Sequence, residues 1–259
     1  LALGDSVAFG HNPFADRSKI ANFNGYPTLI QKAVGSRLEV INPSCVGESS
    51  GSFIDRSAPD NGCANWRSSG SAMHVAYASA SQSQLAFALD ILRRKGSAVK
   101  AVTLGIGAND ILMLSNECAV DPAKYNECVF GRIQGVIGAA AGNAAKIIGA
   151  IRQVYRGPLA FVTYHTANYD PASLDRLAIE SLNNGLKQAV AAVKGDDENL
   201  FIADAFAELE QASAANNGDA CAAGLVIPRP DGAGCDFHPS LNGQREYVEA
   251  LAKVAMPRR

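Results

Sequence analysis

The sequence has no long apolar run and no excess of basic residues. No stretch reaches the roughly 18 consecutive apolar residues that a membrane-spanning helix needs, so stable membrane insertion is not expected. The 23 Lys and Arg residues nearly balance the 25 Asp and Glu residues, for a net charge of −2. No Lys/Arg block occurs, which argues against nucleic acid as a partner. A signal peptide is also missing, because the chain starts directly in an apolar run at Leu1. Removal of a leader, or trimming of the chain, would explain that start.

The six cysteines lack the spacing of a metal site. No pair has C-x-x-C spacing, and only His238 lies within a few residues of a cysteine, so zinc is not expected. The cysteines instead form three pairs that are close in sequence and flanked by turn-forming residues. The simplest proposal is three disulfides, Cys45–Cys63, Cys118–Cys128 and Cys221–Cys235, although six buried free thiols are an alternative. Disulfides would favour an oxidising compartment, and we therefore expect a secreted, extracellular protein.

Short apolar runs alternate along the chain with longer helical periods. The runs are typical of strands that are covered on both faces, and they occupy residues 1–3, 38–42, 98–106, 159–165 and 200–203. Between them, apolar residues recur at helical spacing, most clearly over 133–151. This alternation predicts an α/β fold with a parallel sheet. No linker or repeat interrupts it, so we expect one domain over residues 1–259. The stretches 48–80 and 213–236 show no sustained period and are predicted to be long loops.

Residues suited to acyl transfer occur at the ends of four segments. Ser6 follows the first predicted strand within Gly4-Asp5-Ser6. Gly47 follows the second, Asn109 follows the third, and His238 precedes the last helix within Asp236-Phe237-His238-Pro239. Acyl transfer needs a nucleophile, a base, a group that orients the base, and hydrogen-bond donors for the developing oxyanion. These segments supply that set.

The four blocks, in this order, resemble the GDSL or SGNH hydrolases over nearly the whole chain, especially the secreted bacterial lipases and esterases. The resemblance implies a flavodoxin-like three-layer α/β/α sandwich with a parallel five-stranded sheet. It also implies that Ser6 is the nucleophile and His238 the general base. The N–H groups of Ser6 and Gly47 and the side chain of Asn109 would form the oxyanion hole. Such an enzyme needs no cofactor and no metal.

The acid of the triad departs from the family pattern. The family usually places an Asp three residues before the His, but Cys235 occupies that position. Asp236 lies two residues before His238, and in an extended segment residues i and i+2 share a side. We therefore expect Asp236 to orient His238. Orientation by a backbone carbonyl, with Asp236 capping the last helix, is the alternative.

Other residues offer competing or additional roles. Ser49 lies in Gly47-Glu48-Ser49-Ser50-Gly51, which matches a nucleophile elbow, but no helical stripe follows it as that motif requires. Tyr164, His165 and Asn168 lie at the end of a predicted strand and are expected to line a substrate pocket.

The sequence therefore predicts a secreted, monomeric serine hydrolase that cleaves a small-molecule or lipid carboxylic ester. An esterase for acetylated carbohydrates with the same fold is one alternative. A secreted surface- or carbohydrate-binding module without catalytic activity is another. The sequence leaves the acyl chain length and the alcohol open.

Overall fold

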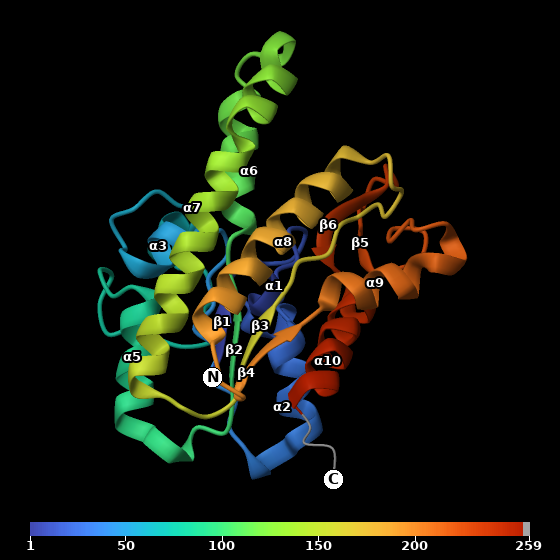
Figure 1. Ribbon diagram of the computed structural model, residues 1–259. Helices are drawn as coiled ribbons and strands as arrows, with labels where there is room; N and C mark the ends of the chain where they lie inside the picture. The colour runs from blue at the N-terminus through green and yellow to red at the C-terminus, as the bar shows by residue number, and fades with distance from the viewer. Residues whose placement is uncertain (256–259) are drawn as a thin grey trace.

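Four short parallel strands form the centre of the computed structural model, which describes residues 1–255 (Figure 1). They lie side by side in the order β1-β2-β3-β4. Their bounds are Ala2–Gly4 (β1), Val102–Gly105 (β2), Leu159–Val162 (β3) and Leu200–Ala203 (β4). All four residues of β3 are buried, as expected for a strand covered on both faces. The predicted α/β fold is confirmed, but the sheet has four strands and the prediction of five was wrong.

The missing fifth strand corresponds to residues 38–42, which run along the free edge of β1 without forming a regular ladder. The Ala2 N–H donates to the Ile41 carbonyl (2.9 Å), so the segment does lie beside β1. The Val40 N–H, however, donates to Oε1 of Gln31 (2.6 Å), and Nε2 of Gln31 donates to the Leu38 carbonyl (3.0 Å). These backbone groups are thus satisfied by a side chain, and Pro43 then follows with no N–H to donate.

Ten α-helices connect and cover the strands of residues 1–255. Their bounds are Ser6–Phe9 (α1), Tyr26–Val34 (α2), Ser50–Ile54 (α3), Cys63–Ser68 (α4), Gln84–Lys95 (α5), Ala108–Cys118 (α6), Tyr125–Val154 (α7), Leu174–Lys194 (α8), Ala205–Ser213 (α9) and Leu241–Ala255 (α10). Helices α5, α7 and α8 pack on one face of the sheet through side chains such as Leu92, Ile147 and Leu186. Helices α2, α9 and α10 pack on the other face through Tyr26, Leu209 and Leu251. No helix of the described residues is long and apolar enough to cross a membrane.

Both segments predicted to be irregular contain regular structure. Residues 48–80 include α3 and α4, and residues 213–236 include β5 (Val226–Pro228) and the start of β6 (Cys235–Pro239). β5 and β6 form an antiparallel hairpin apart from the main sheet. These elements are too short to give a periodic apolar pattern, which is why the prediction missed them.

The structure contains three disulfides, which pair Cys45 with Cys63, Cys118 with Cys128, and Cys221 with Cys235. The first closes the loop that contains Gly47. The second closes the turn between α6 and α7, which project beyond the rest of the molecule (Figure 1). The third ends at the residue before Asp236. The first and third disulfides therefore restrain the segments that carry Gly47 and Asp236, whereas the second restrains the projecting turn.

Candidate active site

Ser6 is the first residue of α1 and directly follows the tight turn at Asp5, at the carboxyl end of the sheet. Asp5 caps α1, because its Oδ1 accepts the Val7 N–H (3.0 Å). The other oxygen, Oδ2, accepts the Tyr164 hydroxyl. Burial raises the pKa of the Asp5 carboxyl to about 6, although these hydrogen bonds act in the opposite direction. Asp5 thus ties the Ser6 turn to the segment that follows β3.

The buried side chain of Gln84 holds Gly4, the last residue of β1 before the turn. Oε1 of Gln84 accepts the Gly4 N–H (2.7 Å), and its Nε2 donates to the Gly4 carbonyl (2.9 Å). The same Nε2 donates to the Glu48 carboxyl group (3.1 Å). Gln84 therefore links the strand before Ser6 to the residue after Gly47.

Ser6, His238 and Asp236 form a continuous chain of short polar contacts. Nε2 of His238 lies 3.0 Å from Oγ of Ser6, and its Nδ1 lies 2.5 Å from Oδ1 of Asp236. Asp236 and His238 both lie in β6, whose extended backbone puts residues i and i+2 on one side. Oδ1 of Asp236 also accepts the His238 N–H (2.9 Å). Burial acts to raise the pKa of Asp236, but the hydrogen bonds from His238 outweigh it, and the net pKa lies below its usual value.

Three hydrogen-bond donors are available near the contacts between Ser6, His238 and Asp236. Ser6 is the first residue of α1, so its N–H has no partner within the helix. The Gly47 N–H is not used in any hydrogen bond among residues 1–255. Nδ2 of Asn109 donates one hydrogen to the Glu48 carbonyl (3.0 Å), which leaves its second hydrogen free. These groups match the donor set of an oxyanion hole.

Asn61 holds two of these donors in place. Its Nδ2 donates to Oδ1 of Asn109 (3.0 Å), and its backbone N–H donates to the Gly47 carbonyl (2.8 Å). Gly47 has a φ of 81°, and a Cβ there would lie 2.3 Å from the Asn61 carbonyl oxygen, so only glycine fits. Sequence reasoning missed Asn61, because nothing in its polar loop distinguishes it from neighbouring residues.

The comparisons with known proteins agree with this architecture. Among solved structures, an acetylxylan esterase from Geobacillus stearothermophilus has a TM-score of 0.57 over 100% of this chain and 95% of its own, at 16% identity. Phospholipase A1 from Streptomyces albidoflavus NA297 also has a TM-score of 0.57, over 98% and 97% of the two chains, at 17% identity. A member of the lipolytic protein G-D-S-L family from Veillonella parvula DSM 2008 has a TM-score of 0.50 over 98% and 95%, at 16% identity. This chain has the GDSL hydrolase fold.

The likeness at such identities concerns the GDSL fold and no further property. No family model and no curated protein sequence matches the chain.

The loop that contains Asn61 allows a direct test of the donor set. Asn61→Ala is expected to lower kcat for a p-nitrophenyl ester about fivefold, because loss of one orienting hydrogen bond to Asn109 costs about 1 kcal/mol. KM should change little, since the donors act on the charge that develops during reaction. Asn116→Ala is a matched control, because Asn116 donates to the other side of Asn61 (3.2 Å) and has no hydrogen bond to Asn109. Equal losses in the two variants would contradict a role for Asn61 in the donor set.

The sequence predicts that Tyr164, His165 and Asn168 line a substrate pocket, but the three residues do not lie together. Tyr164 and His165 line a cavity that begins at Ser6, whereas Asn168 is not among the described residues that line it. Asn168 instead forms a β-bridge with Asp219. The hydroxyl of Tyr164 donates to Asp5.

His165 supports the strand that carries His238. Its Nε2 lies 2.7 Å from the Phe237 carbonyl oxygen, and its Nδ1 lies 2.7 Å from the Tyr247 hydroxyl. Burial lowers the pKa of His165 to about 4, so the ring is neutral at pH 7. A neutral ring has one N–H, and the only acceptor at Nε2 is a carbonyl. Nε2 therefore donates to Phe237, and Nδ1 accepts from Tyr247.

The neutral state of His165 makes stability depend on pH. The unfolded chain protonates this histidine below about pH 6.5, whereas the folded chain resists protonation until about pH 4. The unfolded state thus binds more protons in this window, and the free energy of unfolding falls as the pH falls.

We expect His165→Gln to reduce the difference in unfolding free energy between pH 7 and about pH 4.5 by roughly 2 to 3 kcal/mol. Urea denaturation at both pH values measures it. Burial also lowers the pKa of His11 to about 3 and raises the pKa of Asp5. Both groups titrate in the variant and in the unmodified protein, so their contributions to the pH dependence cancel in the comparison. An unchanged pH dependence in the variant would contradict this account of His165.

The rival nucleophile Ser49 serves a local structural role. Its Oγ donates to the Pro59 carbonyl (2.7 Å) and accepts the Ser52 N–H (3.0 Å), which caps α3. The expectation that no helix follows Ser49 was wrong, since α3 begins at Ser50. The side chain is buried, and no hydrogen bond within residues 1–255 links it to a histidine.

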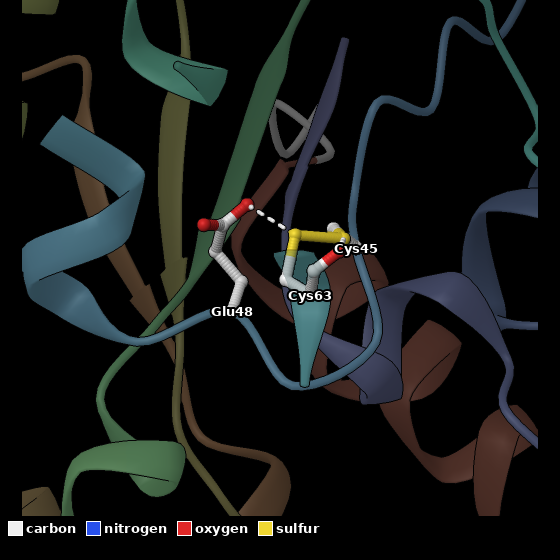
Figure 2. A group of neighbouring side chains, drawn as sticks. All are labelled: Cys45, Glu48 and Cys63. Carbon is white, nitrogen blue, oxygen red and sulfur yellow. Dashed lines mark hydrogen bonds between the residues drawn. A yellow bond between two sulfur atoms is a disulfide. The ribbon is translucent and has the colours of Figure 1, made fainter. Parts of the chain in front are cut away.

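The cluster of Cys45, Glu48 and Cys63 resembles a metal site in composition only. Figure 2 shows the Glu48 carboxyl group against the disulfide between the two cysteines, with an oxygen 3.4 Å from Sγ of Cys63. A disulfide has no thiolate for a metal and no hydrogen to donate. Burial raises the pKa of Glu48, and a protonated carboxyl group can itself donate to sulfur. The cluster therefore anchors the loop that contains Gly47.

Proposed function

We propose that this protein is a serine hydrolase that cleaves carboxylic esters through an acyl-enzyme on Ser6. The observation that carries the proposal is the contact chain from Ser6 through His238 to Asp236, with separations of 3.0 Å and 2.5 Å. A serine hydroxyl needs an adjacent base to become a nucleophile, and the base needs a group that orients it. The three residues come from two distant segments, so local sequence alone does not account for their meeting.

In the proposed mechanism, Oγ of Ser6 attacks the ester carbonyl carbon while Nε2 of His238 accepts the hydroxyl proton. Asp236 accepts a hydrogen bond from the Nδ1–H of His238, keeps its negative charge, and so stabilises the imidazolium that results. The carbonyl oxygen becomes an oxyanion, which the Ser6 and Gly47 N–H groups and the free Asn109 hydrogen stabilise.

The tetrahedral adduct then collapses, and the bond from the carbonyl carbon to the alcohol oxygen breaks. His238 returns its proton to that oxygen, and the alcohol leaves. In the second half, a water molecule gives a proton to His238 and attacks the acyl-enzyme. The bond from the carbonyl carbon to Oγ of Ser6 then breaks, His238 returns its proton to Oγ, and the acid leaves.

The solved structures with this fold support ester chemistry and leave the alcohol open. By name, one acts on acetylated xylan and another on phospholipids, and both substrates are esters. We propose that this chain is a lipase or esterase. An esterase for acetylated carbohydrates is the second candidate, since the Geobacillus protein has that substrate on the same fold.

Hydrolysis of p-nitrophenyl butyrate and of acetylated xylan tests the proposal. We expect the release of p-nitrophenol to require Ser6. When release of the acid from Ser6 is the slow step, we also expect an initial burst of p-nitrophenol equal to the enzyme concentration. Release of acetate from xylan at a higher kcat/KM than hydrolysis of the p-nitrophenyl ester would favour the carbohydrate esterase. No hydrolysis of either, together with binding of a polysaccharide, would favour an inactive binding module.

We also propose that the protein works outside the cell. The three disulfides support this, because such bonds persist in oxidising compartments.

A further inference from the structure

An apolar cavity of about 540 Å³ leads away from Ser6 between α6, α7 and α8. Ser6 and Asn109 line its inner end. In Figure 1, α7 and α8 lie side by side over the sheet and diverge toward the top, where α6 joins α7. Gly185 of α8 allows the close approach near the sheet, because a Cβ there would lie 2.7 Å from Ile137 of α7. Beyond that point the helices separate, and the cavity occupies the space between them.

Each of the three helices turns one face toward this cavity. Most of the residues with which each helix lines the cavity recur at intervals of three and four, which is the spacing of one helical face. They are Ala108, Ile111, Leu112 and Ser115 of α6; Asn126, Val129, Phe130 and Ile133 of α7; and Leu174, Leu177, Ala178 and Ser181 of α8. Apolar helix faces ordinarily pack against a partner, and here three of them meet across unfilled space.

The rim of the cavity is unusually apolar for a surface. Phe130, Leu174, Leu177 and Phe237 line it and are exposed by 58%, 56%, 47% and 47%. Large apolar side chains gathered around an opening mark a binding site for an apolar ligand. Among the described residues that line the cavity, two carry a carboxylate: Asp5, which Tyr164 and Val7 already engage, and Asp175 near the outer end of α8. No Lys or Arg of residues 1–255 lines the cavity, so its walls offer no positive charge to an anionic group.

We propose that this cavity holds the acyl chain of the substrate, and that the preferred esters are those of medium- or long-chain fatty acids. This inference rests on the proposed function, because the ester carbonyl must lie at Ser6 for its acyl chain to enter. An acetyl group reaches only the inner end and leaves the three helix faces uncovered. A longer chain transfers its methylene groups from water onto those faces, and each buried methylene is worth about 0.8 kcal/mol, or about fourfold in kcat/KM.

A series of p-nitrophenyl esters tests the proposal. We expect kcat/KM to rise from the acetate through the butyrate to the octanoate. Ala178→Trp places a large side chain in the cavity and should lower kcat/KM for the octanoate at least tenfold while the acetate changes less than twofold. Ala191→Trp is the matched control, because Ala191 lies on the exposed face of the same helix and should affect neither ester. Equal rates for acetate and octanoate, or equal losses on both esters in Ala178→Trp, would overturn the assignment.

A binding measurement separates this inference from the proposed function. Decanoate should bind to the Ser6→Ala variant in calorimetry and should bind at least tenfold more weakly when Ala178→Trp is added. Binding of this kind without ester hydrolysis by the unmodified protein would overturn the proposed function and leave the cavity assignment supported. Hydrolysis of short esters with no decanoate binding would overturn the cavity assignment alone.

Discussion

Ser6→Ala is expected to lower kcat for p-nitrophenyl butyrate by on the order of 10⁶-fold, because removal of the nucleophile abolishes the covalent route. KM should change little, since the hydroxyl contributes mainly to the reaction step. His238→Ala should cost about as much. The double variant should be hardly worse than either single one, because the two residues act as a unit. Steady-state rates at matched ester concentrations measure all three.

Ser49→Ala is the control for this experiment. It removes the cap of α3 and should lower the free energy of unfolding by about 1 kcal/mol, with activity within a fewfold of the unmodified protein. Loss of hydrolysis in Ser49→Ala, with activity retained in Ser6→Ala, would move the nucleophile to Ser49 and contradict the proposed mechanism.

Asp236→Asn is expected to lower kcat by about 10⁴-fold. The carboxylate holds the hydrogen on Nδ1 of His238, which leaves the Nε2 lone pair directed at Ser6. An amide cannot stabilise the imidazolium, and its NH₂ group favours the opposite tautomer. Because the side chains are nearly isosteric, the fold should be retained, and circular dichroism with thermal unfolding checks this.

The matched control for Asp236→Asn is Asp231→Asn in the same hairpin. Asp231 is exposed and accepts the Ala233 N–H (2.9 Å), without any contact to His238, so activity should be unchanged. A loss of less than tenfold in Asp236→Asn would mean that another group, such as a backbone carbonyl, orients the histidine.

The alternation of apolar runs and helical stripes was sufficient to predict the α/β fold. Buried strands covered on both faces leave a strong apolar signal, and residues 200–203 are a strand with the predicted bounds. Residues 38–42 carry the same signal but form no strand, because Gln31 satisfies backbone groups that a ladder would use. That competition depends on the position of a side chain on α2, which a local apolar pattern does not reveal.

Residues at the ends of strands could be selected from sequence, whereas those that support them from loops could not. Ser6, Asn109 and His238 lie in short motifs. These motifs occur along the chain in the same order as in the GDSL hydrolases that the sequence resembles. Asn61 and Gln84 act through hydrogen bonds across 48 and 80 residues of sequence, to Asn109 and Gly4. Contacts of that range depend on the packed fold. The sequence around a polar loop residue does not show whether the residue makes such a contact.

The cavity beyond Ser6 was equally hidden. Its lining residues give the ordinary amphipathic pattern of helices that pack on a core. Only the divergence of α7 and α8 shows that these faces remain apart, and that depends on the geometry of the whole helical layer (Figure 1).

Covalent labelling with a p-nitrophenyl organophosphonate tests the central claim most directly. The reagent mimics the tetrahedral adduct and reacts with a serine only where a base and oxyanion donors are in place. We predict one phosphonyl group per chain, located on Ser6 by peptide mass spectrometry, with loss of ester hydrolysis in proportion and far slower labelling of His238→Ala. An unlabelled Ser6 in a protein that still hydrolyses esters, or a label on another serine, would contradict the account.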